Sequence, residues 1–534
     1  MSKGRRHVTS SSRRPLIDRE AHKTLRSAWP ITAPGVRASH RSLEATTKTG
    51  PRTPTARSRA TGLDRSVNGL GRLFPEMSAR RTLSDGQRLV VVVATVALLL
   101  GLATIPTVVI VGLNTLGTAV YVLVFVYCAI WFRTVVTRPR PVTVTDEEAR
   151  AVPDNRLPTY TVMVAAYREA NVIAETIHAL EALEYPADRL QLRLLLEADD
   201  RETIDAARAT PHSSNLEIIE IPAGGPRTKP KACNYGLQLT QGKLVTIYDA
   251  EDRPEPLQLR RAAVAFRRLG SRVSCLQAKL HYHNAGENFL TRMFAAEYVT
   301  WFDGMLPALA AMGGPVPLGG TSMHIRRTVL EAVGAWDPHN VTEDADLGVR
   351  LYRLGHRTEV LDSVTYEEAN SDFINWVKQR SRWYKGYLQT WLVHMRQPAR
   401  LWRELGPRGF VGFNVVVGTT PLLAALNPVF WLLTLLWFLA KPEFVQTLFP
   451  AWLYYPALAC LVAGNFLAVY RTLVGVWIAG RPELLWAALL SPVYWLMMSI
   501  GAIRAIVQIM LKPSHWEKTV HGLDRLRRPE VQHA

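Results

Sequence analysis

The feature that most constrains the fold is an apolar run from Leu89 to Leu113, which carries no charged residue over 25 positions. About 20 apolar residues are enough to cross the hydrocarbon core of a bilayer as a helix. The run therefore predicts a membrane-spanning helix rather than a buried core helix. A second run, from Thr115 to Val136, predicts the other half of a transmembrane hairpin formed by residues 87–137.

Three more apolar runs lie near the carboxyl end and predict a multi-pass membrane protein. They are Phe410–Ala440, Trp452–Val474 and Leu484–Leu511. Asn427-Pro428 either splits the first run into two short crossings or kinks a single helix. The last run could lie partly in the membrane interface, so the sequence predicts five or six spans. Residues 409–512 form the C-terminal membrane region, and residues 513–534 form a short basic cytoplasmic end.

The formal net charge of +18 is concentrated in residues 1–86, which hold 18 Lys and Arg against 6 Asp and Glu. This segment is rich in Ser, Thr, Arg and Pro and lacks apolar periodicity, so it is predicted to be a disordered basic tail. Positive charge ahead of a first span favours the cytoplasmic side of the plasma (inner) membrane. Such a tail could also bind nucleic acid, but no nucleic-acid partner is expected.

The sequence pattern of residues 138–408 is that of a soluble domain. Two preceding spans would return this domain to the cytoplasm. Short apolar runs alternate there with helical patterns. Strands are predicted at Tyr160–Ala166, Leu192–Leu196, Leu216–Ile221, Leu244–Tyr248 and Val273–Leu280. This alternation predicts an α/β fold with a doubly wound, mostly parallel sheet, in which ligands bind beyond the carboxyl ends of the strands.

Acidic residues follow three of these predicted strands. The clusters are Tyr167-Arg168-Glu169, Glu197-Ala198-Asp199-Asp200 and Asp249-Ala250-Glu251-Asp252. Crowded carboxylates raise one another's pKa unless a cation lies among them, and hard oxygen ligands suit Mg²⁺ or Mn²⁺. The clusters therefore predict a site for a divalent ion and a phosphate-bearing ligand, with Lys229 and Lys231 facing it. For Asp199-Asp200, capping of the next helix is an equal alternative.

Two further patterns precede the C-terminal spans. Thr342 is expected to cap a helix whose first turn carries Glu343 and Asp344. A helix over residues 373–395 would place four residues on one face, namely Gln379, Arg382, Trp383 and Gly386. Arg382 could hold a diphosphate by forked hydrogen bonds, and Trp383 offers a flat apolar surface for a sugar ring. An ordinary interfacial helix would also use Arg and Trp.

Thr342-Glu343-Asp344, followed 35 residues after Asp344 by Gln379-x-x-Arg382-Trp383, resembles the motifs of the processive family 2 glycosyltransferases. This group contains the cellulose, hyaluronan and chitin synthases, and the resemblance covers roughly residues 155–395. It implies a GT-A fold embedded between transmembrane helices and a nucleoside diphosphate sugar donor. It also implies a Mg²⁺ or Mn²⁺ cofactor and inversion at the anomeric carbon.

The same resemblance implies a role for each matching residue. Asp344 is expected to be the general base, with Glu343 beside it, and Gln379 and Trp383 are expected to bind the acceptor. The expected donor-binding residues are Tyr167, Glu169, Asp199, Asp200, Lys231 and Arg382. Asp249 is the expected first metal ligand. The third position of the group's Asp-x-Asp motif is Glu251 here and Asp252 follows it, so either could be the second ligand. Residues 515–519 (HWEKT) weakly resemble a gating segment.

The implied function is transfer of a sugar, with UDP-glucose as first choice, onto a growing β-linked polysaccharide and its export. The implied partners are the donor, a glycan acceptor, the lipid bilayer and accessory export proteins. The alternative is an enzyme that adds a single sugar to a polyprenyl phosphate or glycolipid. A transporter or receptor would account for the spans but would leave the strand-end acids unexplained.

Overall fold

The structure is a computed structural model of the 534-residue chain and describes residues 56–137 and 141–512. The structure does not describe residues 1–55, 138–140 and 513–534. Most of the predicted tail, the 515–519 segment and the predicted basic end therefore lie outside the described residues. The chain divides into two compact units, Met1–Ser58 and Arg59–Ala534. Apart from the first residues of one helix, every element below belongs to the second unit.

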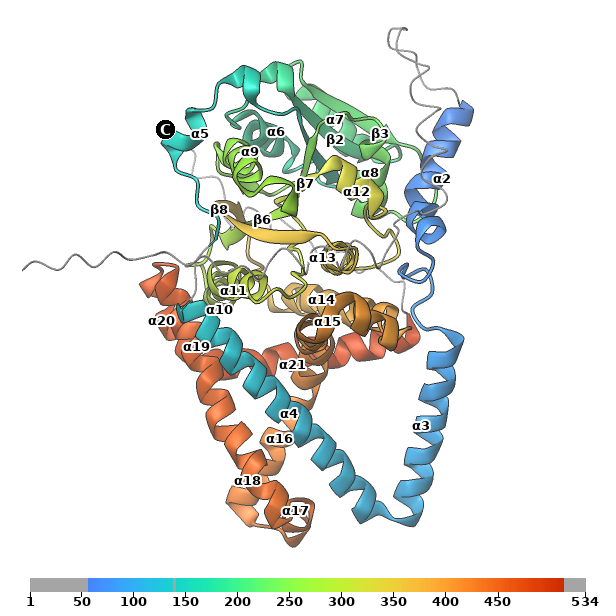
Figure 1. Ribbon diagram of the computed structural model, residues 1–534, viewed down its shortest axis with the longest axis vertical. Helices are drawn as coiled ribbons and strands as arrows, with labels where there is room; N and C mark the ends of the chain where they lie inside the picture. Colours follow the sequence, from blue (N-terminus) through green and yellow to red (C-terminus); the bar gives the residue numbers. More distant parts are fainter. Residues whose placement is uncertain (1–55, 138–140, 513–534) are drawn as a thin grey trace, which may run out of the picture. The chain divides into compact units, whose positions relative to one another are not determined.

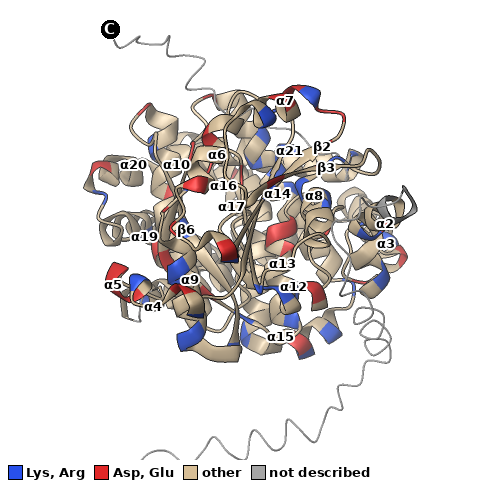
Figure 2. Cartoon of the chain, turned by 90° about the horizontal axis from the view of Figure 1, so that it is seen from above, with Lys and Arg blue, Asp and Glu red and all other residues tan. Residues whose placement is uncertain are grey.

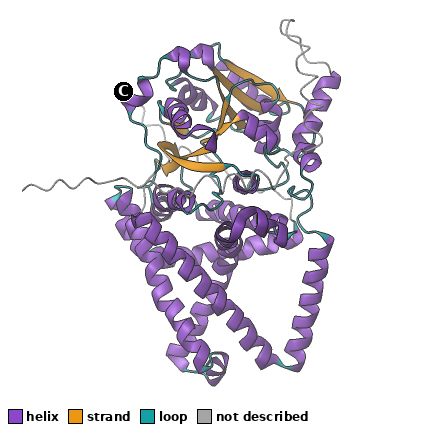
Figure 3. Cartoon of the chain, in the orientation of Figure 1, coloured by secondary structure: helices purple, strands orange, loops and turns teal. Residues whose placement is uncertain are grey.

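One eight-stranded sheet forms the centre of the domain that follows the first two membrane helices (Figures 1 and 3). Its strand order is β3-β2-β1-β4-β7-β6-β8-β5. Strands β1 to β4 are mutually parallel, and so are β6 and β8, whereas β7 and β5 are antiparallel to their neighbours. The strands are β1 (Tyr160–Ala166), β2 (Leu190–Glu197), β3 (Leu216–Ile221), β4 (Leu244–Tyr248), β5 (Arg253–Pro254), β6 (Val273–Tyr282), β7 (Met323–Arg326) and β8 (Arg357–Glu367).

The predicted doubly wound, mostly parallel sheet is confirmed, and all five predicted strands are present. The sequence pattern did not predict β5, β7 and β8. Strand β7 has only four residues, too few for a clear period. Strand β8 intersperses charged residues among its apolar ones, because several of its side chains are only partly covered.

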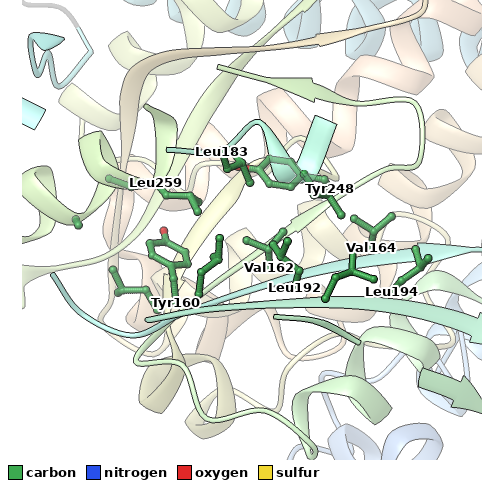
Figure 4. Close-up of a cluster of buried hydrophobic side chains, with 14 of the residues drawn as sticks. Tyr160, Val162, Val164, Leu183, Leu192, Leu194, Tyr248 and Leu259 are labelled. Atoms are coloured by element: carbon green, nitrogen blue, oxygen red, sulfur yellow. The ribbon is translucent and has the colours of Figure 1, made fainter. Parts of the chain in front are cut away.

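Alternate residues of the strands build separate cores on the two faces of the sheet. Val162 and Val164 of β1 pack with Leu192 and Leu194 of β2 in the core shown in Figure 4, whereas Met163 points into the opposite core. This two-residue period is the property of a strand that is buried on both sides. The first core is covered by α6 (Ile173–Glu181), α7 (Arg201–Ala209) and α9 (Gln258–Leu269), and the second by α8 (Lys229–Leu237), α12 (Arg327–Ala332) and α13 (Glu343–Arg353).

The segment before the first span is not the disordered tail that its composition predicted. Helix α2 (Ala56–Leu73) precedes a turn-rich stretch in which Met77 is buried, and Leu70 of the helix is buried too. The Ala79 amide donates a hydrogen bond of 2.6 Å to Asp337 Oδ2. Composition misled because a few well-spaced apolar residues suffice to dock a polar helix. The prediction is therefore wrong for residues 56–86, and residues 1–55 are outside the described part.

Five helices in the described residues are long and apolar enough to cross a membrane. They are α3 (Asp85–Thr104), α4 (Pro106–Thr137), the run Pro398–Ala440, the run Ala451–Ile478 and α21 (Ser491–Leu511). Pro398–Ala440 joins α15 (Pro398–Phe413), a π-helical turn (Asn414–Thr419) and α16 (Thr420–Ala440). Because Pro428 lies inside α16, Asn427-Pro428 does not split that run. Ala451–Ile478 joins α18 (Ala451–Ala459), a π-helical turn (Cys460–Gly464) and α19 (Asn465–Ile478).

A layer of helices separates the sheet from the membrane helices (Figure 1). Its main member, α14 (Phe373–His394), matches the helix predicted over residues 373–395. Helix α21 packs along α14 and crosses the view beneath it, whereas α3 and α4 run steeply downward. The layer also holds α10 (Phe289–Val299), a π-helical turn (Thr300–Met305) and α11 (Leu306–Ala311). The remaining short helices are α5 (Asp146–Arg150), α17 (Glu443–Leu448) and α20 (Leu485–Leu489).

Charges of both signs occur along the helices of the domain when it is seen from above (Figure 2). Helix α7 illustrates this, because Arg201 and Arg208 share it with Glu202 and Asp205. The formal excess of positive charge is therefore a property of the amino-terminal segment more than of this domain.

Candidate active site

A cavity of about 710 Å³ opens beyond the carboxyl ends of β1, β2 and β4. Tyr167 and Glu169 follow β1, Glu197 ends β2, and Asp249 and Glu251 follow β4, and all five side chains line this cavity. Parallel strands bring their carboxyl ends to one edge of a sheet, which is why these distant residues meet. The structure thus brings together acids from all three predicted clusters.

Asp200 supports the loop after β1 and is not among the cavity-lining residues. Its Oδ2 accepts a hydrogen bond of 2.5 Å from the Arg168 amide, and its Oδ1 caps α7 by accepting one of 3.4 Å from the Thr203 amide. Arg168 has a φ of +56°, a conformation that non-glycine residues adopt only with support. Asp200 therefore fits the capping alternative, and it stabilises the turn that carries Tyr167 and Glu169.

Asp199 acts on the cavity through a cation. It forms an ion pair with Arg227, which does line the cavity and whose guanidinium carbon lies 5.9 Å from the centre of the Tyr167 ring. A positive charge over an aromatic face is attracted to the ring. Arg227 was not predicted as a site residue, because it precedes α8 in a loop without a recognisable pattern.

The two lysines of α8 have different surroundings. Lys231, the predicted diphosphate ligand, is fully buried, and its Nζ lies 2.7 Å from Glu197 Oε1 and outside the cavity lining. Lys229 lines the cavity, where it pairs with Asp249 and donates a 3.0 Å hydrogen bond to the Gly320 carbonyl. Two residues that are two positions apart on a helix point in directions about 200° apart, so only one of these two lysines can face the cavity. Lys229 therefore replaces Lys231 as the candidate phosphate-binding lysine.

The acids after β4 also divide into two groups. Asp252 is buried, and its Oδ2 accepts hydrogen bonds from the Asp249 amide, at 2.7 Å, and from the Thr321 hydroxyl. Burial, and then the charges of Asp249 and Glu251, raise the pKa of Asp252 well above its usual value. Asp249 and Glu251 line the cavity and Asp252 does not, so Asp252 shapes the turn. Within the described residues, no three Asp, Glu, His or Cys side chains are grouped as a complete metal site.

Glu343 and Asp344 begin α13 at the wall of the same cavity. Gly320 approaches so closely that a β-carbon there would lie 3.0 Å from Asp344 Oδ2. Burial raises the pKa of Asp344 to about 6, although the Ala345 amide and Lys229 oppose the shift. Burial and the charge of Asp344 raise the pKa of Glu343 to about 8. Asp344 Oδ1 is buried without a hydrogen-bond partner, which is unusual for a carboxylate.

Thr342 occupies the N-cap position of α13, but its hydroxyl forms no capping hydrogen bond, contrary to the prediction. The hydroxyl is buried without a partner, and the side chain packs directly on Gly386 of α14. The contact joins the helix that carries Asp344 to the helix that carries the Gln-x-x-Arg-Trp pattern.

The predicted face of α14 borders the cavity. Gln379, Arg382 and Trp383 all line it. Burial lowers the pKa of Arg382, while the charges of Glu343, Asp249 and Asp344 oppose that shift. Trp383 is stacked on Tyr298, with ring centres 6.1 Å apart. The structure therefore places Asp249, Asp344 and Arg382 around one cavity, as the proposed shared site needs.

Several lining residues were not predicted as site residues. Arg380, one position after Gln379, forms an ion pair with Glu297 and lies 4.8 Å from the Trp383 ring centre, so it fixes that ring. Glu367 and Glu368, at the end of β8, add two more carboxylates. Because β8 was not recognised as a strand, these acids could not be assigned to the carboxyl edge of the sheet.

The cavity continues beyond the domain between the helices that could cross a membrane. Its lining includes Cys128 of α4, Thr420 and Leu423 of α16, Arg471 of α19 and Met498 of α21. A single cavity is therefore shared by carboxylates of the domain and by residues of helices that are long and apolar enough to cross a membrane.

Residues 158–386 match the family model described as glycosyltransferase like family 2. This segment is a family 2 glycosyltransferase domain. The match spans the candidate site from Tyr167 to Trp383, and the α/β sheet of the glycosyltransferase domain has the expected GT-A type of fold.

Named relatives share this part of the chain. "Probable glycosyltransferase YdaM" of Bacillus subtilis is 28% identical over 261 residues, which cover 46% of this chain and 60% of that protein. "Beta-monoglucosyldiacylglycerol synthase" of a Synechocystis species is 28% identical over 380 residues, covering 68% of this chain and 75% of that protein. "Probable glucomannan 4-beta-mannosyltransferase 1" of Arabidopsis thaliana is 28% identical over 268 residues, covering 48% and 46%. The chain thus spans between about half and three quarters of these relatives' lengths.

Among solved structures, a mannosyltransferase from Pyrobaculum calidifontis, in complex with GDP-Man and Mn²⁺, superposes with a TM-score of 0.49. It is 18% identical, and the match covers 75% of this chain and 98% of that chain.

Proposed function

We propose that this protein transfers a single sugar from a nucleoside diphosphate sugar to the hydroxyl of a membrane lipid. The observation that carries the proposal is the shared cavity, which begins at Asp249 and Asp344 and continues between the membrane helices to Leu423 and Met498. An acceptor in the bilayer could therefore reach the catalytic carboxylate without leaving the membrane. The similarity to a glucosyldiacylglycerol synthase over 68% of the chain supports this choice.

The donor would lie at the edge of the sheet. Tyr167 and Glu169 are suited to the nucleotide, and Arg227, Lys229 and Arg382 supply positive charge for the diphosphate. Cations fixed around the leaving group stabilise the negative charge that develops on it in the transition state. UDP-glucose is the first choice of donor.

A divalent cation fits the same place. Asp249 and Glu251 offer oxygen ligands beside the cations, and Mg²⁺ or Mn²⁺ is usually held by one or two carboxylates together with substrate phosphates. Burial, and after it the charges of neighbouring carboxylates, raise the pKa values of Asp252 and Glu343, and a cation nearby would offset the second of these causes. Asp249 and Glu251 would hold the ion, which would offset charge on the departing diphosphate. Asp252 supports the turn instead.

Asp344 is the proposed general base. It would accept the proton of the acceptor hydroxyl as that oxygen bonds to the anomeric carbon, while the bond from this carbon to the diphosphate oxygen breaks. The nucleoside diphosphate leaves with the bonding electrons, and the configuration inverts. Gln379 and Trp383 would orient the attacking group, because both line the wall next to Asp344.

We also propose a topology with the catalytic domain in the cytoplasm, beside the inner membrane. The turn between α3 and α4 and the short helix α17 lie at the same end, since Asn114 of α4 donates a 2.7 Å hydrogen bond to the Leu448 carbonyl. Two hairpins would give four crossings. Helix α21 packs along α14, which supports an interfacial position for it and a cytoplasmic carboxyl end.

The test is the size and solubility of the product. Membranes containing the protein would be incubated with radiolabelled UDP-glucose and their own total lipid, extracted with chloroform and methanol, and resolved by thin-layer chromatography. We expect label in one chloroform-soluble glycolipid from which a glucosidase releases one glucose per lipid, and no such product from Asp344→Asn membranes. A label found only in an insoluble or long-chain polysaccharide would refute the proposal in favour of polymer synthesis.

A further inference from the structure

A second cavity of about 710 Å³ lies among the membrane helices and adjoins the catalytic cavity. Eight residues line both, including Cys128, Tyr384, Leu423 and Arg471. Helices α4, α16, α18, α19 and α21 contribute its walls, together with α14 and α17. The two cavities therefore form adjoining chambers with a common wall, and we call the second one the membrane chamber.

The membrane chamber is mostly apolar. Phe125, Phe430, Leu461 and Met498 are typical of its lining, and no aspartate or glutamate of the described chain takes part. A polysaccharide in transit would need polar groups to replace the water around its hydroxyls, because unpaired buried polar groups are costly. Hydrocarbon chains need none. The lining thus suits the acyl chains of a lipid.

Arg471 lies at the junction of the two chambers and is the cation that lines both. Within the described residues its guanidinium has no carboxylate partner. Its Nη1 lies 4.0 Å from Cys128 Sγ, and its Nε is buried without a hydrogen-bond partner. Arginine is rare within membrane helices and normally marks a functional site when it faces a cavity. An arginine without a carboxylate partner at this position is suited to bind an anionic group of a ligand.

A contact of the next residue shows where Arg471 lies along its candidate span. The next residue, Thr472, offers its carbonyl oxygen to the hydroxyl of Thr300 at 3.4 Å, and Thr300 belongs to the domain-side layer of helices. Arg471 therefore lies near the domain end of its span. An acidic group held there would place its hydrocarbon chains in the membrane chamber and its outermost atoms toward Asp344.

The helices around both chambers deviate from α-helical geometry where they face them. Each of three π-helical turns, Thr300–Met305, Asn414–Thr419 and Cys460–Gly464, contributes lining residues to one of the chambers. Such turns are rare and often occur at functional sites. They mark these walls as shaped for a ligand.

We propose that the acceptor is a phosphate-bearing lipid. Its acyl chains occupy the membrane chamber, its phosphate is held by Arg471, and a hydroxyl of its head group faces Asp344. This inference rests on the proposed function and makes it more specific, because a neutral diacylglycerol would leave Arg471 unpaired.

Binding and transfer should be measured separately. The protein carrying Asp344→Asn, which cannot turn over, would be purified in detergent and titrated with tritiated dioleoyl phosphatidylglycerol or dioleoylglycerol, which have the same chains. We expect the phosphatidylglycerol to bind at least about tenfold more tightly, as the loss of charge-assisted hydrogen bonds predicts for the neutral lipid. Glycerol 3-phosphate should not displace it, since the chains supply most of the affinity.

Substitutions at position 471 locate the effect. Adding Arg471→Gln should abolish the preference for phosphatidylglycerol, whereas Arg471→Lys should retain most of it. Arg133→Gln is the matched control, because Arg133 lies near the domain end of α4 and outside both linings. Retained binding of UDP by each variant would show that it is folded.

Equal binding of the two lipids, or a preference that Arg471→Gln leaves unchanged, would overturn the inference. Displacement by glycerol 3-phosphate at similar concentrations would also overturn it, since it would reveal a site for soluble phosphates. These results concern binding alone. Selective lipid binding combined with a polymeric product from the unsubstituted protein would instead refute the proposed function.

Discussion

Thr342 packs directly against the backbone of Gly386, and a β-carbon at position 386 would overlap with the threonine side chain. The contact sets the spacing between α13, which carries Asp344, and α14, which carries Arg382 and Trp383. Glycine at this position therefore allows the short distance between the proposed base and the groups proposed to bind donor and acceptor.

Gly386→Ala should lower kcat by about 100-fold, because a displacement of about 1 Å between reacting groups can have that effect. The affinity for UDP, measured by titration calorimetry, should change much less. Gly112→Ala is the matched control, since Gly112 also lies within a helix and has open space around it. A Gly386→Ala enzyme with normal kcat would show that the contact does not set the catalytic geometry.

Asp344→Asn should abolish sugar transfer while UDP binding persists, since the amide keeps the shape but cannot accept the proton. The same change should raise the thermal midpoint at pH 7.5 by a few degrees. The pKa of about 6 in the folded protein exceeds the usual value, so the charged form is disfavoured by folding and stability falls as the pH rises toward 6. The gain should shrink as the pH falls from 6 toward 4 and vanish below about pH 3, where both states hold the proton.

The pH dependence of kcat/KM should show an acid limb near pH 6. A general base must be deprotonated, and the pKa of Asp344 is raised to about 6 by burial. Below this pH the rate should fall about tenfold per unit. A limb near pH 4, at the ordinary pKa of an aspartate, would mean that Asp344 is not buried during catalysis or is not the base.

Glu251→Gln and Asp252→Asn should separate metal binding from loop support. We expect Glu251→Gln to raise the Mn²⁺ concentration for half-maximal activity about tenfold or more, because it removes a ligand that faces the cavity. Asp252→Asn should change that concentration less than about twofold, because its Oδ2 is hydrogen-bonded to the Asp249 amide and the Thr321 hydroxyl and the residue does not line the cavity. The opposite order of effects would make Asp252 the ligand.

Lys229→Met and Lys231→Met should likewise differ in kind. Lys229 faces the proposed diphosphate, so its loss should weaken UDP binding about tenfold or more and affect uridine binding little. Lys231 is buried against Glu197, so its loss should destabilise the protein by about 3–5 kcal/mol by leaving a buried carboxylate unpaired. Denaturation curves and calorimetry would distinguish the two. Unchanged stability of Lys231→Met would contradict this assignment.

Periodicity predicted the parallel half of the sheet because those strands are buried on both sides and read as continuous apolar runs, such as Leu244–Tyr248. It could not predict β7 and β8, whose residues are few or partly exposed. Helix α14 was predicted almost to the residue, since its polar pattern matched a known motif.

Within the candidate site, residue types were easier to predict than directions. Lys229 and Lys231, or Glu251 and Asp252, are chemically alike and lie within two positions of each other. Only the rotation of a helix or turn decides which one faces the cavity. Arg471 carried no sequence signal beyond being charged within an apolar run. Its interpretation depends on α4 and α16, which line the same cavity and come from distant parts of the chain.

The docked segment before the first span has a consequence for where the enzyme can work. Asn234 of α8 donates a 3.0 Å hydrogen bond to the Ser66 carbonyl, and Asp337 accepts one from the Ala79 amide, so the chain is fastened to the catalytic domain shortly before it enters α3. The domain is thereby anchored from two sides and cannot swing outward on a flexible tether. With the function proposed above, the protein would modify lipids of its own bilayer and would leave those of a neighbouring vesicle untouched.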